Sequence, residues 1–125
     1  MKRALVIEDN ADNMKLITFI LESNGYDAIR AENGKTGIDL AFKEKPDFIL
    51  LDIQLSDMDG LEVPKAIRKS EINGDIPVIA ITSYAMSGDR KRMIEAGCNG
   101  YLEKPIDPVA IMNQIKEIVE ERIAD

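Results

Sequence analysis

Three carboxylates lie at the ends of apolar segments, where they could bind a metal ion together. Glu8 and Asp9 follow the apolar run that ends at Ile7, and Asp52 ends the run DFILLD. If these side chains meet, their charges repel, and a hard cation is the usual solution. The chain has no histidine and a single cysteine, which excludes a Cys/His zinc site. Oxygen ligands alone select Mg²⁺ or Mn²⁺.

A hydroxyl and an amine at similar positions would complete a site for phosphoryl chemistry. Thr82 ends the run VIAIT, and Lys104 follows the short stretch Tyr101–Glu103. A carboxylate that faces a metal can attack phosphorus and form an aspartyl phosphate. The three oxygens of the transferred group then need neutralising, which a metal, a lysine and a hydroxyl donor can do. The pattern favours Asp52 as the phosphoacceptor.

Each of these residues also has an ordinary structural explanation. Asp9 or Asn10 could simply cap the following helix, because acidic and amide side chains are favoured at helix starts. Thr82 could be a strand-end threonine, and Lys104 an exposed surface lysine. What favours a site is the combination of these residue types, in this order and on alternating strands.

The elements that must position these residues alternate between short apolar runs and amphipathic stretches. Continuous apolar runs are typical of strands buried on both faces, and apolar residues three or four apart are typical of helices. The predicted strands are Ala4–Ile7, Tyr26–Ala31, Asp47–Leu51, Val78–Ile81 and Tyr101–Glu103. The predicted helices contain Met14–Leu21 (stopped by Gly25), Gly37–Phe42, Leu61–Ile67, Asp89–Ala96 (closed by Gly97), and a last helix with Asp107 as N-cap, Pro108 at its first position and an apolar stripe from Ile111 to Val119.

This alternation predicts an α/β fold: a doubly wound, five-stranded parallel sheet with helices on both faces. Parallel strands joined through helices require right-handed crossovers, which cover both sides of the sheet. Ligands of such sheets bind beyond the carboxyl ends of the strands. All the candidate site residues follow strands, so we expect them at one edge.

Length and charge exclude several classes of function. The chain has 125 residues, enough for one domain, and a formal net charge of −7. The negative charge argues against direct binding to nucleic acid or to an anionic membrane surface. The first apolar run is interrupted at Glu8, too soon for a signal peptide or a membrane helix, so we expect a cytoplasmic protein. Cys98 cannot form an intramolecular disulfide, and we expect it to be a packing residue.

Over its whole length the sequence resembles the receiver domains of response regulators in two-component signalling. The motifs that carry the resemblance are IEDN at Ile7–Asn10, DFILLDIQLSDMDG at Asp47–Gly60, IPVIAITSYA at Ile76–Ala85 and GYLEKPI at Gly100–Ile106. The run Asp9-Asn10-x-x-Asn13 is most similar to single-domain receivers of the DivK type and to receivers of hybrid kinases. The resemblance implies a flavodoxin-like sheet with strand order 2-1-3-4-5, and residues 1–125 as one receiver domain without an effector domain.

The resemblance also implies a metal site and a phosphoacceptor. Asp52 would accept the phosphoryl group, and Mg²⁺ (or Mn²⁺) would be held by Glu8, Asp9, Asp52 and the backbone carbonyl of Gln54. The loop that carries Gln54 departs from the family, because Ser56 stands where proline is most common. We read Asp57-Met58-Asp59 in this loop as turn residues.

Further roles are implied on the other strands. Thr82 would be the hydroxyl switch residue, with Ser83 beside it as a phosphoryl-binding residue, and Tyr101 the aromatic partner that turns with Thr82. Lys104 would pair with the phosphoryl group ahead of a cis peptide bond to Pro105. The side chains of Gln54 and Tyr84 would tune how long the phosphoryl group persists.

The implied function is a stand-alone switch, not an enzyme beyond its own phosphorylation and dephosphorylation. It would receive a phosphoryl group from a histidine kinase or a histidine phosphotransfer protein. It would then signal to an output protein through residues 89–122, or relay the group, as a monomer or weak dimer. The Arg90-Lys91-Arg92 cluster on that face is either a solvated helix surface or a positive patch for a partner.

Three other functions fit parts of the pattern. A receiver module of a hybrid kinase shares every motif, although the Met1 start weighs against it. A metal-dependent phosphohydrolase would use Asp52 as its nucleophile, but it needs a cap or substrate pocket that 125 residues do not supply. A flavodoxin-type electron carrier needs a phosphate loop after the first strand, where Glu8 and Asp9 would repel phosphate.

Overall fold

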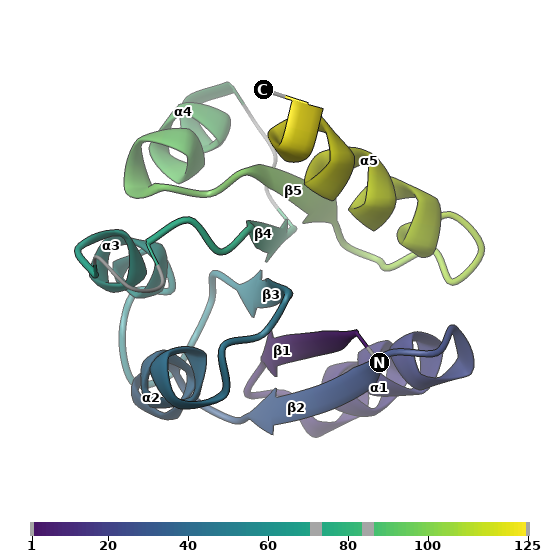
Figure 1. Cartoon of the computed structure of the whole chain (residues 1–125). Coiled ribbons are helices and arrows are strands. Elements are labelled where there is room, and N and C mark those ends of the chain that lie inside the picture. Colours follow the sequence, from purple (N-terminus) through teal and green to yellow (C-terminus); the bar gives the residue numbers. More distant parts are fainter. Residues whose placement is uncertain (1, 71–73, 84–86, 125) are drawn as a thin grey trace.

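The computed structural model describes residues 2–70, 74–83 and 87–124 (Figure 1). Within these ranges five strands alternate with five helices. In chain order the elements are β1 (Arg3–Ile7), α1 (Ala11–Ser23), β2 (Asp27–Ala31), α2 (Gly34–Glu44), β3 (Phe48–Asp52), α3 (Glu62–Arg68), β4 (Val78–Thr82), α4 (Ser87–Ala96), β5 (Gly100–Glu103) and α5 (Ile111–Ala124). All pairings are parallel and the strand order is β2-β1-β3-β4-β5. The predicted fold class and strand order are confirmed.

The three central strands are buried on both faces, which explains their continuous apolar sequences. Every residue of β3 and β4 is buried, and so is every residue of β1 after Arg3. The edge strands β2 and β5 have exposed or half-buried positions, and their sequences are correspondingly more polar. Burial on two faces therefore distinguishes the centre of the sheet from its edges.

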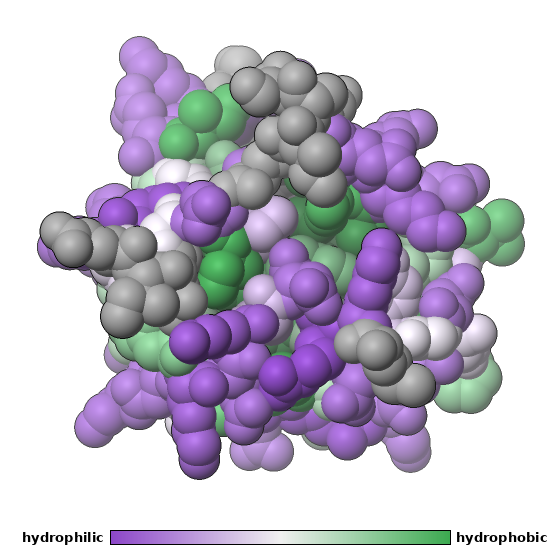
Figure 2. Space-filling model, viewed as in Figure 1, coloured by the Kyte–Doolittle hydropathy of each residue, from purple (hydrophilic) through white to green (hydrophobic). Residues whose placement is uncertain are grey.

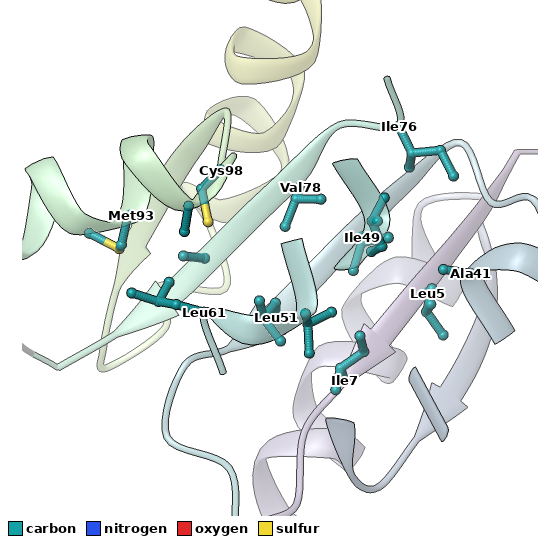
Figure 3. Packing of buried hydrophobic residues seen from close by; sticks show 14 of the residues in the cluster. Leu5, Ile7, Ala41, Ile49, Leu51, Leu61, Ile76, Val78, Met93 and Cys98 are labelled. Carbon is teal, nitrogen blue, oxygen red and sulfur yellow. The ribbon is translucent and has the colours of Figure 1, made fainter. Parts of the chain in front are cut away.

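Helices cover the sheet in two layers. Helices α1 and α5 pack on one face, over a core that includes Val6, Leu50 and Ile79. Helices α2, α3 and α4 pack on the other face, over Leu51 and its neighbours (Figure 3). Cys98 belongs to this second cluster, and burial raises the pKa of its thiol to about 12. It is a packing residue, as predicted.

The ends of the helices follow the predicted capping with small shifts. Asn10 caps α1 by accepting a hydrogen bond from the Asn13 amide at 3.0 Å. Gly25 and Gly97 follow α1 and α4 with φ of 84° and 110°, values that suit glycine. Asp107 accepts hydrogen bonds from the next turn, but the last helix begins at Ile111, later than predicted. Residues 108–110 form a turn ahead of it.

Hydrophilic residues cover most of the face seen in Figure 2, with small hydrophobic areas between them. Among the described residues no helix combines the length and the apolar character that a membrane span requires. The buried apolar residues form two clusters, one on each face of the sheet.

Candidate functional site

The carboxyl ends of β1 and β3 bring the three acidic residues together. The two strands pair in register, with Ile7 opposite Leu51, so the residues that follow them are neighbours. Glu8, Asp9 and Asp52 each offer a carboxylate oxygen, and these oxygens lie within 4.8 Å of one another. The convergence predicted for residues at the carboxyl ends of parallel strands is therefore confirmed for these three carboxylates.

The two buried carboxyl groups, those of Glu8 and Asp52, have pKa values shifted in opposite directions. Glu8 is 1% exposed and Asp52 3% exposed, whereas Asp9 faces solvent. Burial raises the pKa of Glu8 to about 7, and the adjacent Asp52 adds to this effect. Burial also raises the pKa of Asp52, but hydrogen bonds with Glu8, the Gln54 amide and Lys104 outweigh it and hold that pKa below its usual range.

The donor set fits a hard divalent cation. Oε1 of Glu8 is a buried acceptor with no hydrogen-bond donor among the described residues. A buried carboxylate oxygen without a partner is costly unless a cation or proton satisfies it. The Gln54 amide donates to Oδ1 of Asp52 at 2.9 Å, which places the backbone at Gln54 beside the carboxylates. Carboxylate and peptide oxygens are the ligands that Mg²⁺ prefers.

Lys104 reaches Asp52 from the end of β5. Its Nζ lies 2.9 Å from Oδ2 of Asp52, and its side chain is 20% exposed. The Lys104 amide donates to the carbonyl of Thr82 at 2.8 Å, and the peptide bond to Pro105 is cis, as predicted. The alternative of an exposed surface lysine is therefore wrong.

Thr82 and Ser83 lie at the end of the neighbouring strand. Asp52 pairs with Ile81, so Thr82 stands one residue beyond that pair, and it is 1% exposed. Ser83 is exposed and lines a groove of about 390 Å³ together with Glu8 and Lys104. Two hydroxyl-bearing residues thus follow one another at the end of β4, beside the end of β3 that carries Asp52.

Tyr101 is half-buried on β5 and packs against the cluster under α2, α3 and α4. The guanidinium carbon of Arg90, on α4, lies 5.2 Å from the centroid of its ring. This distance is in the range of a cation–π contact. Tyr84, the other predicted aromatic, lies outside the described residues.

One residue near the site, Asp57, makes contacts that its sequence context does not predict. The sequence predicts a turn residue, but its carboxylate also accepts hydrogen bonds from the amides of Gly34 and Lys35 at the start of α2. These partners lie 22 and 23 residues away in the chain. No local pattern could have revealed the contact.

The doubly wound sheet and the acidic carboxyl edge define a receiver domain. The family model described as the response regulator receiver domain matches residues 4–116, and the chain belongs to this family.

Among curated relatives, the polar-differentiation response regulators DivK of Brucella anthropi and Brucella ovis are each 44% identical over 115 residues. The match covers 92% of this chain and 94% of each relative. The chain is thus a DivK-like receiver domain of two-component systems. Receiver domains are generally phosphoacceptor switches, and the family implies kinase and effector partners.

Solved structures agree with this assignment. The receiver domain of the sensor histidine kinase PA1611 of Pseudomonas aeruginosa, with a magnesium ion coordinated in its active-site cleft, has 32% identity and a TM-score of 0.86. The alignment covers 95% of this chain and 98% of that one. Chemotaxis response regulator CheY4 of Vibrio cholerae has a TM-score of 0.90 over 94% of this chain and 98% of its own, at 23% identity, which supports the fold alone.

Proposed function

We propose that the chain accepts a phosphoryl group on Asp52, with Mg²⁺ held by Glu8, Asp9, Asp52 and the carbonyl of Gln54. The observation that carries this proposal is the environment of Asp52. Its carboxylate is buried beside two other carboxylates and forms an ion pair with Lys104 at 2.9 Å. The magnesium ion named for the PA1611 receiver domain supports the choice of metal.

The residues of the chain divide the chemistry between them. A low pKa keeps Asp52 ionised at neutral pH, so one of its oxygens can attack phosphorus while the bond to the donor's nitrogen or oxygen breaks. The Lys104 ammonium stays near to neutralise the phosphoryl oxygens, and the hydroxyls of Thr82 and Ser83 donate hydrogen bonds to them. The metal would contribute positive charge to the same oxygens. The product is an aspartyl phosphate and the released donor group.

The output of this reaction is a change of surface. Thr82 moves toward the phosphoryl group, and Tyr101 turns inward from under Arg90, so an existing equilibrium shifts. The face formed by residues 89–122 then binds an output protein, after phosphorylation by a histidine kinase or a histidine phosphotransfer protein. The side chain of Gln54 is exposed beside Asp52 and cannot act as a base. We still predict that the side chains of Gln54 and Tyr84 determine the rate at which the phosphoryl group is lost.

Acetyl phosphate with Mg²⁺ tests the proposal directly. We expect one added phosphoryl group in the mass spectrum, labile to hydroxylamine, and amide shifts that spread from Thr82 into residues 89–122. Asp52→Asn should abolish the adduct, whereas the matched change Asp39→Asn, at an exposed carboxylate of α2, should leave it intact. An adduct that survives hydroxylamine would be an ester of serine, threonine or tyrosine and would refute the assignment.

A further inference from the structure

The loop between β3 and α3, residues 53–61, carries Gln54 and must therefore hold one of the proposed metal ligands in place. It contains no proline to restrict its backbone. Its closure comes from a bridge between Gln54 and Asp59, and from a hydrogen bond from the Gly60 amide to the Ile53 carbonyl at 3.1 Å. A side chain at Gly60 would collide with the backbone of Ile53, so this close approach requires glycine.

Asp57 fastens this loop to the start of α2. Its Oδ1 accepts a hydrogen bond from the Gly34 amide at 2.9 Å, and its Oδ2 accepts one from the Lys35 amide at 3.1 Å. These are the first two amides of α2, which have no partner inside the helix. Asn33, the N-cap residue of α2, accepts a hydrogen bond from the third amide of the helix, that of Thr36, at 2.8 Å. The two side chains thus satisfy different amides of one helix end.

The same end of α2 also lies against the strand that carries the other ligands. A Cβ added at Gly37 would overlap the side chain of Ile7, the residue directly before Glu8. A Cβ at Gly34 would lie 2.6 Å from the sulfur of Met58, next to Asp57 in the loop. The first turns of α2 therefore contact both parts of the proposed metal site, the end of β1 and the loop after β3.

We propose that Asp57 is a positioning residue that sets the affinity for Mg²⁺ by holding the loop of Gln54 against α2. The inference rests on the proposed function, because the metal site is proposed there. Asp57 does not act as a ligand itself, since both of its carboxylate oxygens are bonded to amides of α2. Without this contact the loop gains freedom, and the Gln54 carbonyl spends less time facing the carboxylates.

The test compares Mg²⁺ affinity, measured by isothermal titration calorimetry, in Asp57→Ala and Asn33→Ala. Both changes remove a side-chain cap from the same end of α2, but only the first releases the loop. We expect Asp57→Ala to weaken Mg²⁺ binding about tenfold, at the low end for residues that support a metal ligand. Asn33→Ala should lower the melting temperature and leave the affinity unchanged. Asp57→Asn, which keeps one acceptor, should fall between wild type and Asp57→Ala.

Kinetics provide a second readout that a purely structural role would not give. At saturating Mg²⁺ the loop is held by the metal, so phosphorylation of Asp57→Ala by acetyl phosphate should return to the wild-type rate. Equal losses of affinity in Asp57→Ala and Asn33→Ala, or an unchanged affinity in Asp57→Ala, would overturn the inference while leaving the metal site intact. A wild-type protein that binds no Mg²⁺ would instead refute the proposed site and this inference with it.

Discussion

Asp52 has neighbours of both charges, and their balance defines its chemistry. Lys104 compensates the charge of Asp52, while Glu8, buried beside it, competes for the same stabilising groups. Desolvation therefore raises the pKa of Glu8. At Asp52 the hydrogen bonds and the ion pair outweigh desolvation, so the pKa of Asp52 falls. Such opposed shifts in adjacent carboxyl groups are typical of functional sites.

Cys98 allows a prediction about pH at the same scale. Its thiol has a pKa near 12 in the fold, against an ordinary value of 9.0. Below the ordinary value the thiol is neutral in both the folded and the unfolded chain and contributes no pH dependence. As the pH rises above that value, the unfolded chain releases the proton and the folded chain does not, so stability falls.

We therefore expect the free energy of unfolding to fall more in wild type than in Cys98→Ala between about pH 8 and about pH 10. Urea unfolding of both proteins at the two pH values measures this difference. The other titrating groups are common to both and cancel. Parallel losses in the two proteins would show that the Cys98 thiol ionises in the fold as freely as in the unfolded chain.

At the scale of elements, Arg68 joins segments that the sheet alone does not connect. Its guanidinium donates to the carbonyls of Gly74, Ile76 and Gly97 at 2.6 to 3.0 Å, and to Oδ1 of Asn99 at 2.8 Å. It thereby ties the end of α3 to the start of β4 and to the end of α4. The planar fork of arginine suits such a set of acceptors, which a lysine could not reproduce.

Arg68→Met should lower the free energy of unfolding by about 3 kcal/mol, because it keeps the aliphatic stem but leaves several carbonyls without a donor. Urea unfolding measures the change. The control is Lys65→Met on the same helix, whose ion pair with Glu62 is exposed at 3.4 Å and contributes little. Similar losses in the two variants would mean that water replaces Arg68 at its acceptors.

The elements were predictable from the sequence to the extent that burial shaped their composition. The central strands were located because both faces are apolar, whereas Tyr26 was assigned to β2 and lies outside it. The Tyr26 ring packs edge-on against the ring of Phe48. An aromatic residue at this position therefore serves packing just outside the strand, although its type is also typical of strands. Glu8, Asp9, Asp52 and Lys104 were found because they follow strands, and the topology of the sheet brings them together.

Asp57 and Arg68 could not be found in this way. The partners of Asp57 lie 22 and 23 residues away, and those that Arg68 reaches beyond α4, Gly97 and Asn99, lie 29 and 31 residues away. Only the packing of α2 on the loop, or of α3 beside α4, places these groups within reach. The chemistry of these two residues gives no local signal, since an aspartate in a turn and an arginine at the end of a helix are both common. Long-range anchoring of loops is a property of the tertiary fold.

At the scale of the whole molecule, the proposed metal site is also a source of stability. Bound Mg²⁺ would relieve the repulsion between Glu8, Asp9 and Asp52 and link β1 to the loop after β3. A ligand that binds only the folded state raises its stability, by about 2.7 kcal/mol at a concentration 100 times its Kd. We expect millimolar Mg²⁺ to raise the melting temperature.

Thermal melts of wild type and of Asp9→Asn, each with and without Mg²⁺, measure this effect. The shift should be large in wild type and small in Asp9→Asn, which loses a ligand and part of the repulsion. Melts in Na⁺ at the same ionic strength, without Ca²⁺ or Mg²⁺, serve as the control, because salt alone screens the net charge of −7. Equal shifts in both proteins would point to screening and not to a metal site.

Oε1 of Glu8, which has no hydrogen-bond partner in the part of the chain that the structure describes, has a consequence for the engineering of this fold. Burial raises the pKa of Glu8 to about 7, so at neutral pH without a bound cation a buried, partly ionised group lies beside Asp52. We therefore expect the neutral substitution Glu8→Gln to fold more stably under these conditions. A directed-evolution screen for heat resistance, run in the presence of a chelator, is therefore expected to select neutral substitutions at Glu8, which would remove a ligand from the proposed metal site.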